Sequence, residues 1–198
     1  MSATNAPFGL RPAFHPSGLD RAQALAGGIV SGYASNILKG QPVVYGTTAN
    51  SITIGTIGIA ANTGAWTGSF AGVQWTDTTG RARISNYWPA STAYTAGTCV
   101  AYFYNDQNIV YEIQADATMA QTTIGNEYNF SNIAAGSTTT GLSQATLGAS
   151  TAVGNGVQGQ MRVVDLAPYV DNAWGDAYTI VRVVCANSQF FGAVTAIA

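Results

Sequence analysis

The residues that could most clearly carry out chemistry are two carboxylates on one expected strand. Glu112 and Asp116 face the same side of the alternating segment 109–116, four residues apart. That spacing is about 13 Å along a strand, longer than the separation of the carboxyl groups in either class of glycosidase. A carboxylate from a neighbouring strand would have to complete the pair. A solvent-facing polar strand face is therefore the simpler interpretation of these two residues.

Other reactive motifs lack the context that their chemistry requires. Residues 154–159 match G-x-G-x-x-G, but a β-like run follows them where a dinucleotide site needs a helix. His15 is the only histidine, which leaves neither a zinc ligand set nor a Ser-His-Asp triad. Asp106 lies among asparagines, a composition that suits a calcium ion or simply a turn. We expect no catalytic residue, no metal site and no cofactor.

The arginines indicate contacts between surfaces. Arg182 shares a strand face with apolar residues, and a charge in that position is either paired with a carboxylate or turned toward another subunit. Arg81 and Arg83 share one face of the expected strand 81–86, where exposed charges discourage edge-to-edge pairing.

Charge is scarce along the whole chain. Of 198 residues, 8% are charged, against about 25% in a typical soluble domain, while 47% are hydrophobic. The net charge of −2 and the single lysine, Lys39, exclude a basic surface that tracks nucleic-acid phosphates. Seven basic and nine acidic side chains leave much of the surface uncharged, and we expect a partner to cover part of it.

Nothing in the sequence suggests a membrane protein. There is no run of 18 apolar residues and no basic segment followed by an apolar one at the N-terminus, so we expect neither a membrane span nor a secretory signal. Cys99 and Cys185 are the two cysteines and lie far apart. Free buried thiols in a protein made in a cytoplasm, or one disulfide, both fit this pattern.

Short β segments must position these residues. The loop 105–108 predicts a hairpin, and residues 115–124 suit a turn or two of helix. Runs rich in Val, Ile, Thr and aromatic residues predict strands at 28–34, 42–46, 51–60, 69–76, 81–86, 99–104, 109–116, 157–166 and 178–186. We expect an all-β fold, with a single β-barrel or β-sandwich domain of about nine short strands.

Two segments depart from this pattern. Residues 1–27 contain three prolines, two phenylalanines and three leucines. They predict an extended N-terminal arm, which either packs on its own domain or reaches a neighbouring subunit. Residues 28–198 are expected to form the β-rich body. Within it, residues 134–160 are low in complexity and predict a long surface loop.

Five blocks of the sequence have distinctive wording: Asn5-Ala6-Pro7-Phe8-Gly9-Leu10-Arg11-Pro12, Thr76-Asp77-Thr78-Thr79-Gly80, Ser85-Asn86-Tyr87-Trp88-Pro89-Ala90, Val110-Tyr111-Glu112-Ile113-Gln114-Ala115-Asp116 and 136–142. These blocks, the last more weakly, resemble structural proteins of tailed bacteriophages, a group that we associate with capsid decoration, or cement, proteins. The usual pattern of that group has lysine at the position of Arg81.

The resemblance implies a β-rich virion protein on the outer face of an icosahedral phage capsid, synthesised in the host cytoplasm. Its partners would be the major capsid protein, whose neighbouring subunits it clamps, and copies of itself in a homotrimer. No enzymatic activity, direct nucleic-acid binding or membrane contact is implied. Capsid or subunit contacts are predicted at Phe8, Leu10, Arg11, Phe14, Tyr87, Trp88 and Arg182.

Two further expectations concern the arm and the loop. Removing residues 1–16 is expected to abolish capsid binding and leave the body folded, and residues 136–150 would become ordered on a partner.

The alternative function is another virion component, such as a tail or head–tail connector protein. A more remote one is a carbohydrate-binding β-domain that stacks sugars on Trp66, Trp75 and Trp88.

Overall fold

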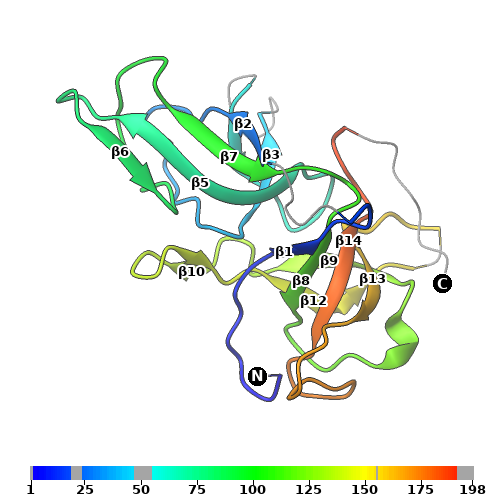
Figure 1. Cartoon of the computed structure of the whole chain (residues 1–198). Coiled ribbons are helices and arrows are strands. Elements are labelled where there is room, and N and C mark those ends of the chain that lie inside the picture. The colour runs from blue at the N-terminus through cyan, green and yellow to red at the C-terminus, as the bar shows by residue number, and fades with distance from the viewer. Residues whose placement is uncertain (1, 19–23, 47–54, 155, 191–198) are drawn as a thin grey trace.

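Two antiparallel β-sheets make up most of the molecule (Figure 1). The computed structural model describes residues 2–18, 24–46, 55–154 and 156–190. These ranges contain fourteen strands, β1–β14, and a single described helical turn, the 3-10 turn η2 (Gln121–Thr123). No helix in the described part is long and apolar enough to cross a membrane. The prediction of an all-β fold is confirmed.

The first sheet, called sheet A here, combines the N-terminal segment with the C-terminal half of the chain. Its last strand, β12 (Thr146–Ala152), also meets the end of β8 (Val110–Gln114) through one parallel bridge between Ala115 and Leu147. The strand order is β1 (Arg11–Phe14), β8 (Val110–Gln114), β14 (Ile180–Cys185), β13 (Met161–Leu166), β9 (Glu127–Ser131) and β12 (Thr146–Ala152).

The second sheet, sheet B, is built from the middle of the sequence. Its strand order is β2 (Ala24–Gly27), β7 (Val100–Tyr104), β5 (Gly68–Thr76), β3 (Pro42–Tyr45) and β4 (Ile57–Ile59), with β6 (Ala82–Ser85) beside β5. A separate hairpin consists of β10 (Gly136–Ser137) and β11 (Leu142–Ser143). The described residues form no closed barrel, and their arrangement is sandwich-like.

Each sheet has its own apolar core, because alternate side chains of its strands point to one face. Tyr111 and Ile113 of β8 belong to the core of sheet A, and Phe70 and Phe103 of sheet B belong to the other. Trp66 precedes β5 in sheet B, yet its ring lies in the core of sheet A, in edge contact with aromatic rings there. This side chain therefore ties the two sheets together.

Most predicted strands coincide with observed ones, but one does not. The structure has strands within or overlapping 42–46, 69–76, 81–86, 99–104, 109–116, 157–166 and 178–186. The prediction for 28–34 is wrong, because β2 ends at Gly27 and turns follow it. In the segment 51–60, β4 covers Ile57–Ile59, and residues 51–54 lie outside the described residues.

The predicted hairpin at 105–108 is also wrong. β7 before this loop pairs with β2 and β5 in sheet B, whereas β8 after it pairs with β1 and β14 in sheet A. The loop therefore carries the chain from one sheet to the other. The loop does form the turn that its residue types predict, since the Asp106 carboxylate accepts a hydrogen bond from the backbone N–H of Asn108 at 2.8 Å.

The N-terminal segment packs on its own domain, which is the first of the two alternatives for it. Strand β1 pairs with β8, and Leu10 is fully buried in the core of sheet A. Removing residues 1–16 would therefore expose part of the core. The expectation that such a truncation leaves the body folded is corrected on this ground.

The low-complexity segment 134–160 contains strands, so the prediction of a long surface loop is wrong there. Strand β12 pairs with β9, and Leu147 within β12 is fully buried in the core of sheet A. Small residues around it allow close approach, since a Cβ at Gly148 would lie 2.3 Å from the Thr151 hydroxyl oxygen. One apolar side chain among small ones is enough to anchor an edge strand.

Both cysteines are free, as one of the two alternatives predicted. Burial raises the pKa of the Cys185 thiol to about 12 and also raises the pKa of Cys99. The reactive thiolate of Cys185 is therefore very rare at pH 8. We expect Ellman's reagent at pH 8 to modify native Cys185 much more slowly than Cys185 in urea. Equal rates in the two states would contradict the burial of this thiol.

Candidate functional site

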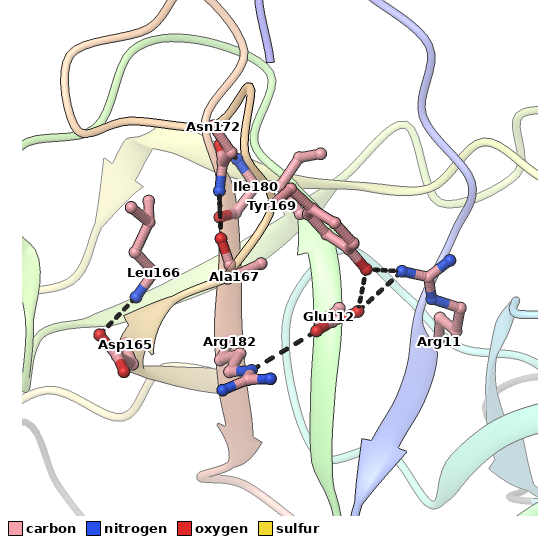
Figure 2. A network of polar contacts seen from close by, with 9 residues as sticks. All are labelled: Arg11, Glu112, Asp165, Leu166, Ala167, Tyr169, Asn172, Ile180 and Arg182. Atoms are coloured by element: carbon pink, nitrogen blue, oxygen red, sulfur yellow. Dashed lines mark hydrogen bonds and ion pairs between the residues drawn. The ribbon is translucent and has the colours of Figure 1, made fainter. Parts of the chain in front are cut away.

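Glu112 lies in the middle of β8, between two arginines on the adjacent strands. Arg11 of β1 and Arg182 of β14 are its cross-strand neighbours. Arg11 Nη2 is 2.7 Å from Glu112 Oε2, and Arg182 Nε is 3.4 Å from Oε1 (Figure 2). The Tyr169 hydroxyl donates a hydrogen bond to Oε2 and accepts one from Arg11. We call these four residues the Glu112 cluster.

Two segments cover the polar face of β8. Asn172 fixes the loop that carries Tyr169, because its side-chain amide donates to the carbonyl oxygens of Ala167 and Ile180, both at 2.8 Å (Figure 2). The amide of Gln114 exchanges hydrogen bonds with the backbone of residues 4–6. The expected solvent-facing strand face is therefore wrong for its central residues, since both Glu112 and Gln114 are buried.

The cluster holds Glu112 as a carboxylate. Burial raises its pKa, but hydrogen bonds from Tyr169 and Arg11 and the charges of both arginines outweigh burial and bring the pKa below its ordinary value of 4.5. Burial and the hydrogen bond to Glu112 raise the pKa of Tyr169, which remains a donor. An ionised carboxylate has no proton to donate, so this arrangement does not suit a general acid.

The second candidate carboxylate has a different setting. One Asp116 oxygen accepts a hydrogen bond from the backbone N–H of Ala149 at 2.8 Å. Asp116 lines a polar hollow of about 350 Å³ with Asn132 and Gln144 among others, whereas Glu112 is not part of that lining. The structure thus gives the two carboxylates separate partners, and they do not form a catalytic pair.

Aromatic rings surround the two arginines of the cluster. The Arg11 guanidinium carbon lies 4.8 Å from the centre of the Phe8 ring, and that of Arg182 lies 5.2 Å from the Phe14 ring. These distances are typical of cation–π contacts. The side chain of Arg11 is 51% exposed and Phe14 is 44% exposed. Four of the seven predicted contact residues thus share one partly exposed surface.

The other three predicted contact residues lie elsewhere. Leu10 is fully buried, and its backbone N–H donates to the Gly40 carbonyl at 2.7 Å. Trp88 is also fully buried, with its ring against Trp75 and Tyr94. Both side chains fill the protein's own cores, so the prediction that they contact a partner is corrected. Tyr87 is half-buried beside Trp88 and remote from the cluster in sequence.

Sequence reasoning missed Tyr169. It lies 57 residues from Glu112, in a loop after β13, and no spacing connects the two. A tyrosine that follows proline in a polar loop carries no signal of its own. The position of Arg182 among apolar residues was the usable signal, and the ion pair with Glu112 is one of the two explanations predicted for it.

The remaining motifs have the following surroundings in the described residues. His15 contacts Ser17 and Asp106, and no group of three or more His, Cys, Asp or Glu side chains there is arranged to hold a metal. Strand β13 follows the glycine-rich segment 154–159. Trp66, Trp75 and Trp88 are 1%, 9% and 0% exposed, so the prediction that they stack on sugars is wrong.

Three of the sequence blocks quoted above, 5–12, 85–90 and 136–142, lie against the short segment 37–41. Leu10 N–H donates to the Gly40 carbonyl, Trp88 N–H to the Ile37 carbonyl, and Lys39 N–H to the Gly141 carbonyl. The Asn86 side chain bonds to the Thr140 carbonyl at 3.1 Å, and Arg11 pairs with Glu112. Blocks 5–12, 85–90 and 136–142, distant in sequence, therefore meet around segment 37–41, and block 110–116 contacts the first of them.

The fold and the site define an all-β protein with a buried carboxylate that its own arginines and tyrosine saturate, bordered by exposed aromatic and cationic groups. Comparison of the chain with family models, with curated proteins and with solved structures finds no match.

Proposed function

We propose that the protein is a virion structural protein that binds the outer surface of an icosahedral phage capsid and clamps neighbouring major capsid subunits. One observation carries the proposal: four of the five blocks that resemble phage structural proteins contact one another or the segment 37–41, near the exposed Arg11 and Phe14. These blocks come from distant parts of the chain, and their contacts support a shared role in docking.

The distribution of charge supports an extensive protein contact. The accessible surface is 9181 Å², and few charged residues are available to cover it. Several of them neutralise one another on sheet A, where Arg11, Glu112, Arg182 and Asp165 are cross-strand neighbours in alternating sign. Arg162 and Glu127 form another ion pair at 2.7 Å. Aromatic and arginine side chains on a charge-poor surface are typical of interface centres.

Clamping follows from mass action. A protein that binds across subunit junctions of the mature shell stabilises that shell in proportion to its occupancy. Many copies on one shell add their effects. We propose that copies of the protein also contact one another, as homotrimers, on the outer face of the capsid after synthesis in the host cytoplasm.

The first test is the copy number in purified particles, measured by gel densitometry against the major capsid protein. A ratio near one-to-one supports the clamping function. A few copies per particle would place the protein in the tail or the head–tail connector, and absence from particles would overturn a virion role.

A matched pair of variants tests the proposed surface. Phe14 and Leu25 are equally exposed, at 44% and 45%, but Phe14 lies beside the Glu112 cluster and Leu25 lies on sheet B. We expect Phe14→Ser to weaken binding to purified capsids at least tenfold, because exposed aromatics at interface centres dominate binding. Leu25→Ser is expected to bind normally. Equal binding by both variants would exclude Phe14 from the interface.

A further inference from the structure

A hollow of about 220 Å³ opens beside the Glu112 cluster, where the N-terminal segment meets sheet B. Leu10 and Phe70, which are 0% and 1% exposed, form apolar parts of its lining. Phe8 and Leu142 add further apolar surface, and Leu142 is 40% exposed. Ligand sites for drug-sized molecules usually measure about 300–1,000 Å³. A hollow of this size therefore suits one large side chain better than a cofactor.

Two cations border this hollow, and none of its lining residues is acidic. They are Arg11 and Lys39, the only lysine of the chain. The polar contacts of Arg11 with Glu112 and Tyr169 all use Nη2, and a guanidinium carries five N–H donors. Lys39 is exposed, and within the described residues its ammonium group has no ion pair. The hollow thus combines an apolar interior with Lys39, which has no ion pair in the described part of the chain, and with Arg11, whose printed ion pair to Glu112 uses Nη2.

The backbone around the hollow is held in place. Gly9 adopts a φ of +75°, and a Cβ there would lie 2.6 Å from the Gly40 carbonyl oxygen. The Ser69 hydroxyl donates to the Leu10 carbonyl at 2.6 Å. These contacts fix the N-terminal segment against Gly40 and β5, so the hollow exists before a ligand arrives.

We propose that this hollow binds an acidic segment of a partner protein, with one large apolar side chain inside and adjacent carboxylates at Arg11 and Lys39. Charge complementarity selects this occupant, because a neutral apolar segment leaves Lys39 without a counter-charge and a small anion leaves the apolar walls exposed. The inference rests on the proposed function and deepens it, since it names the kind of capsid segment that the surface recognises.

Two short peptides test the chemistry without any capsid. The probes are Gly-Glu-Phe-Glu-Gly and its matched analogue Gly-Gln-Phe-Gln-Gly, each with fluorescein on the N-terminal amine and an amidated C-terminus. They are titrated with the full chain by fluorescence anisotropy at low ionic strength. We expect the acidic peptide to bind at least tenfold more tightly than the glutamine peptide. Added salt should weaken the acidic peptide more than the neutral one. Equal affinities, or no binding of the acidic peptide, would overturn the proposal.

Variants of single residues test whether the acidic peptide binds in this hollow. Lys39→Gln removes the unpaired cation, and Arg81→Gln removes an exposed cation on a different part of the chain, with the same change in net charge. We expect Lys39→Gln and Leu142→Ser each to weaken acidic-peptide binding at least fivefold, with Arg81→Gln unchanged. Equal losses for Lys39→Gln and Arg81→Gln would show that net charge alone acts, and would overturn the site.

The peptide assay tests the hollow and the particle assay tests the capsid function, so a negative result in one does not decide the other. If the protein coats capsids but does not bind the acidic peptide, the hollow is not the recognition site and the decoration function stands. If the hollow binds the peptide as expected but the protein is absent from particles, the binding chemistry stands and the capsid function is overturned.

Discussion

Replacing Trp66 with alanine is expected to lower the free energy of unfolding by about 4 kcal/mol, within the range for removal of a buried aromatic ring. Trp66 is 1% exposed, and its ring centre lies 5.3 Å from that of Phe130 and 6.0 Å from that of Tyr111. Its indole N–H donates to the Gln160 carbonyl at 3.1 Å. The variant thus loses ring contacts between the sheets and leaves a buried carbonyl oxygen without this donor.

Urea denaturation measures the loss, and thermal melting gives a second value. For a chain of this length, about 4 kcal/mol corresponds to a fall in Tm of about 8–16 °C. Trp66→Phe is the matched control, because it keeps an aromatic ring and removes the indole donor. We expect that variant to retain more than half of the stability that alanine loses. A loss below about 1 kcal/mol for Trp66→Ala would show that the ring does not join the two sheets.

Replacing Glu112 with glutamine is expected to lower the free energy of unfolding by about 2 kcal/mol at pH 7. The substitution keeps the shape of the side chain but leaves Arg11 and Arg182 without their counter-charge. Breaking a buried ion pair costs about 3–5 kcal/mol, and the exposure of Arg11 reduces that figure because water can solvate its guanidinium.

The contribution of Glu112 depends on pH with a definite sign. Its folded-state pKa lies below the ordinary value of 4.5, so its stabilising effect is complete above that value and is lost as the pH falls through the folded-state pKa. The difference in Tm between wild type and Glu112→Gln should therefore be largest near pH 7 and shrink below pH 4.5. Thermal melts at intervals between pH 7 and pH 3 measure it.

Arg83→Gln is the control for this prediction. Arg83 and Arg11 have nearly equal side-chain exposure, 52% and 51%, but Arg83 pairs with the more exposed Asp77. We expect Arg83→Gln to cost less than 1 kcal/mol, as is usual for surface ion pairs. The loss of stability in Glu112→Gln could instead be as small as that in Arg83→Gln, or the same at every pH between 7 and 3. Either result would show that the charge of Glu112 does not stabilise the protein.

Local patterns predicted the strands with strong alternation. In the segment 109–116, Tyr111 and Ile113 point into the core as expected, because neighbouring side chains of a strand face opposite sides whatever the tertiary context. The same reasoning fails for β12, where small residues surround Leu147 and the signal for a strand is weak. It also fails for β1, where prolines and glycines hide a strand that its partner β8 stabilises.

The candidate site was only partly accessible from the sequence. Arg182 among apolar residues correctly pointed to either an ion pair or a contact, since an uncompensated charge on such a face is costly. Phe8, Leu10 and Phe14 stood out because a solvated tail seldom carries two phenylalanines and a leucine. The meeting of Arg11 with Glu112 depends on the pairing of β1 with β8, which brings together residues about 100 positions apart. Local sequence carries no information about such a pairing.

By itself the sequence determined the all-β class, the low surface charge and the alternation that buries one face of each strong strand, because these depend on composition and on the period of a strand. The tertiary structure decided which strands share a sheet, that residues 105–108 pass between sheets, and that Leu10 and Trp88 fill cores. It also decided that Tyr169 completes the Glu112 cluster. Those outcomes depend on long-range pairing and packing, where many weak contacts between distant segments select one arrangement.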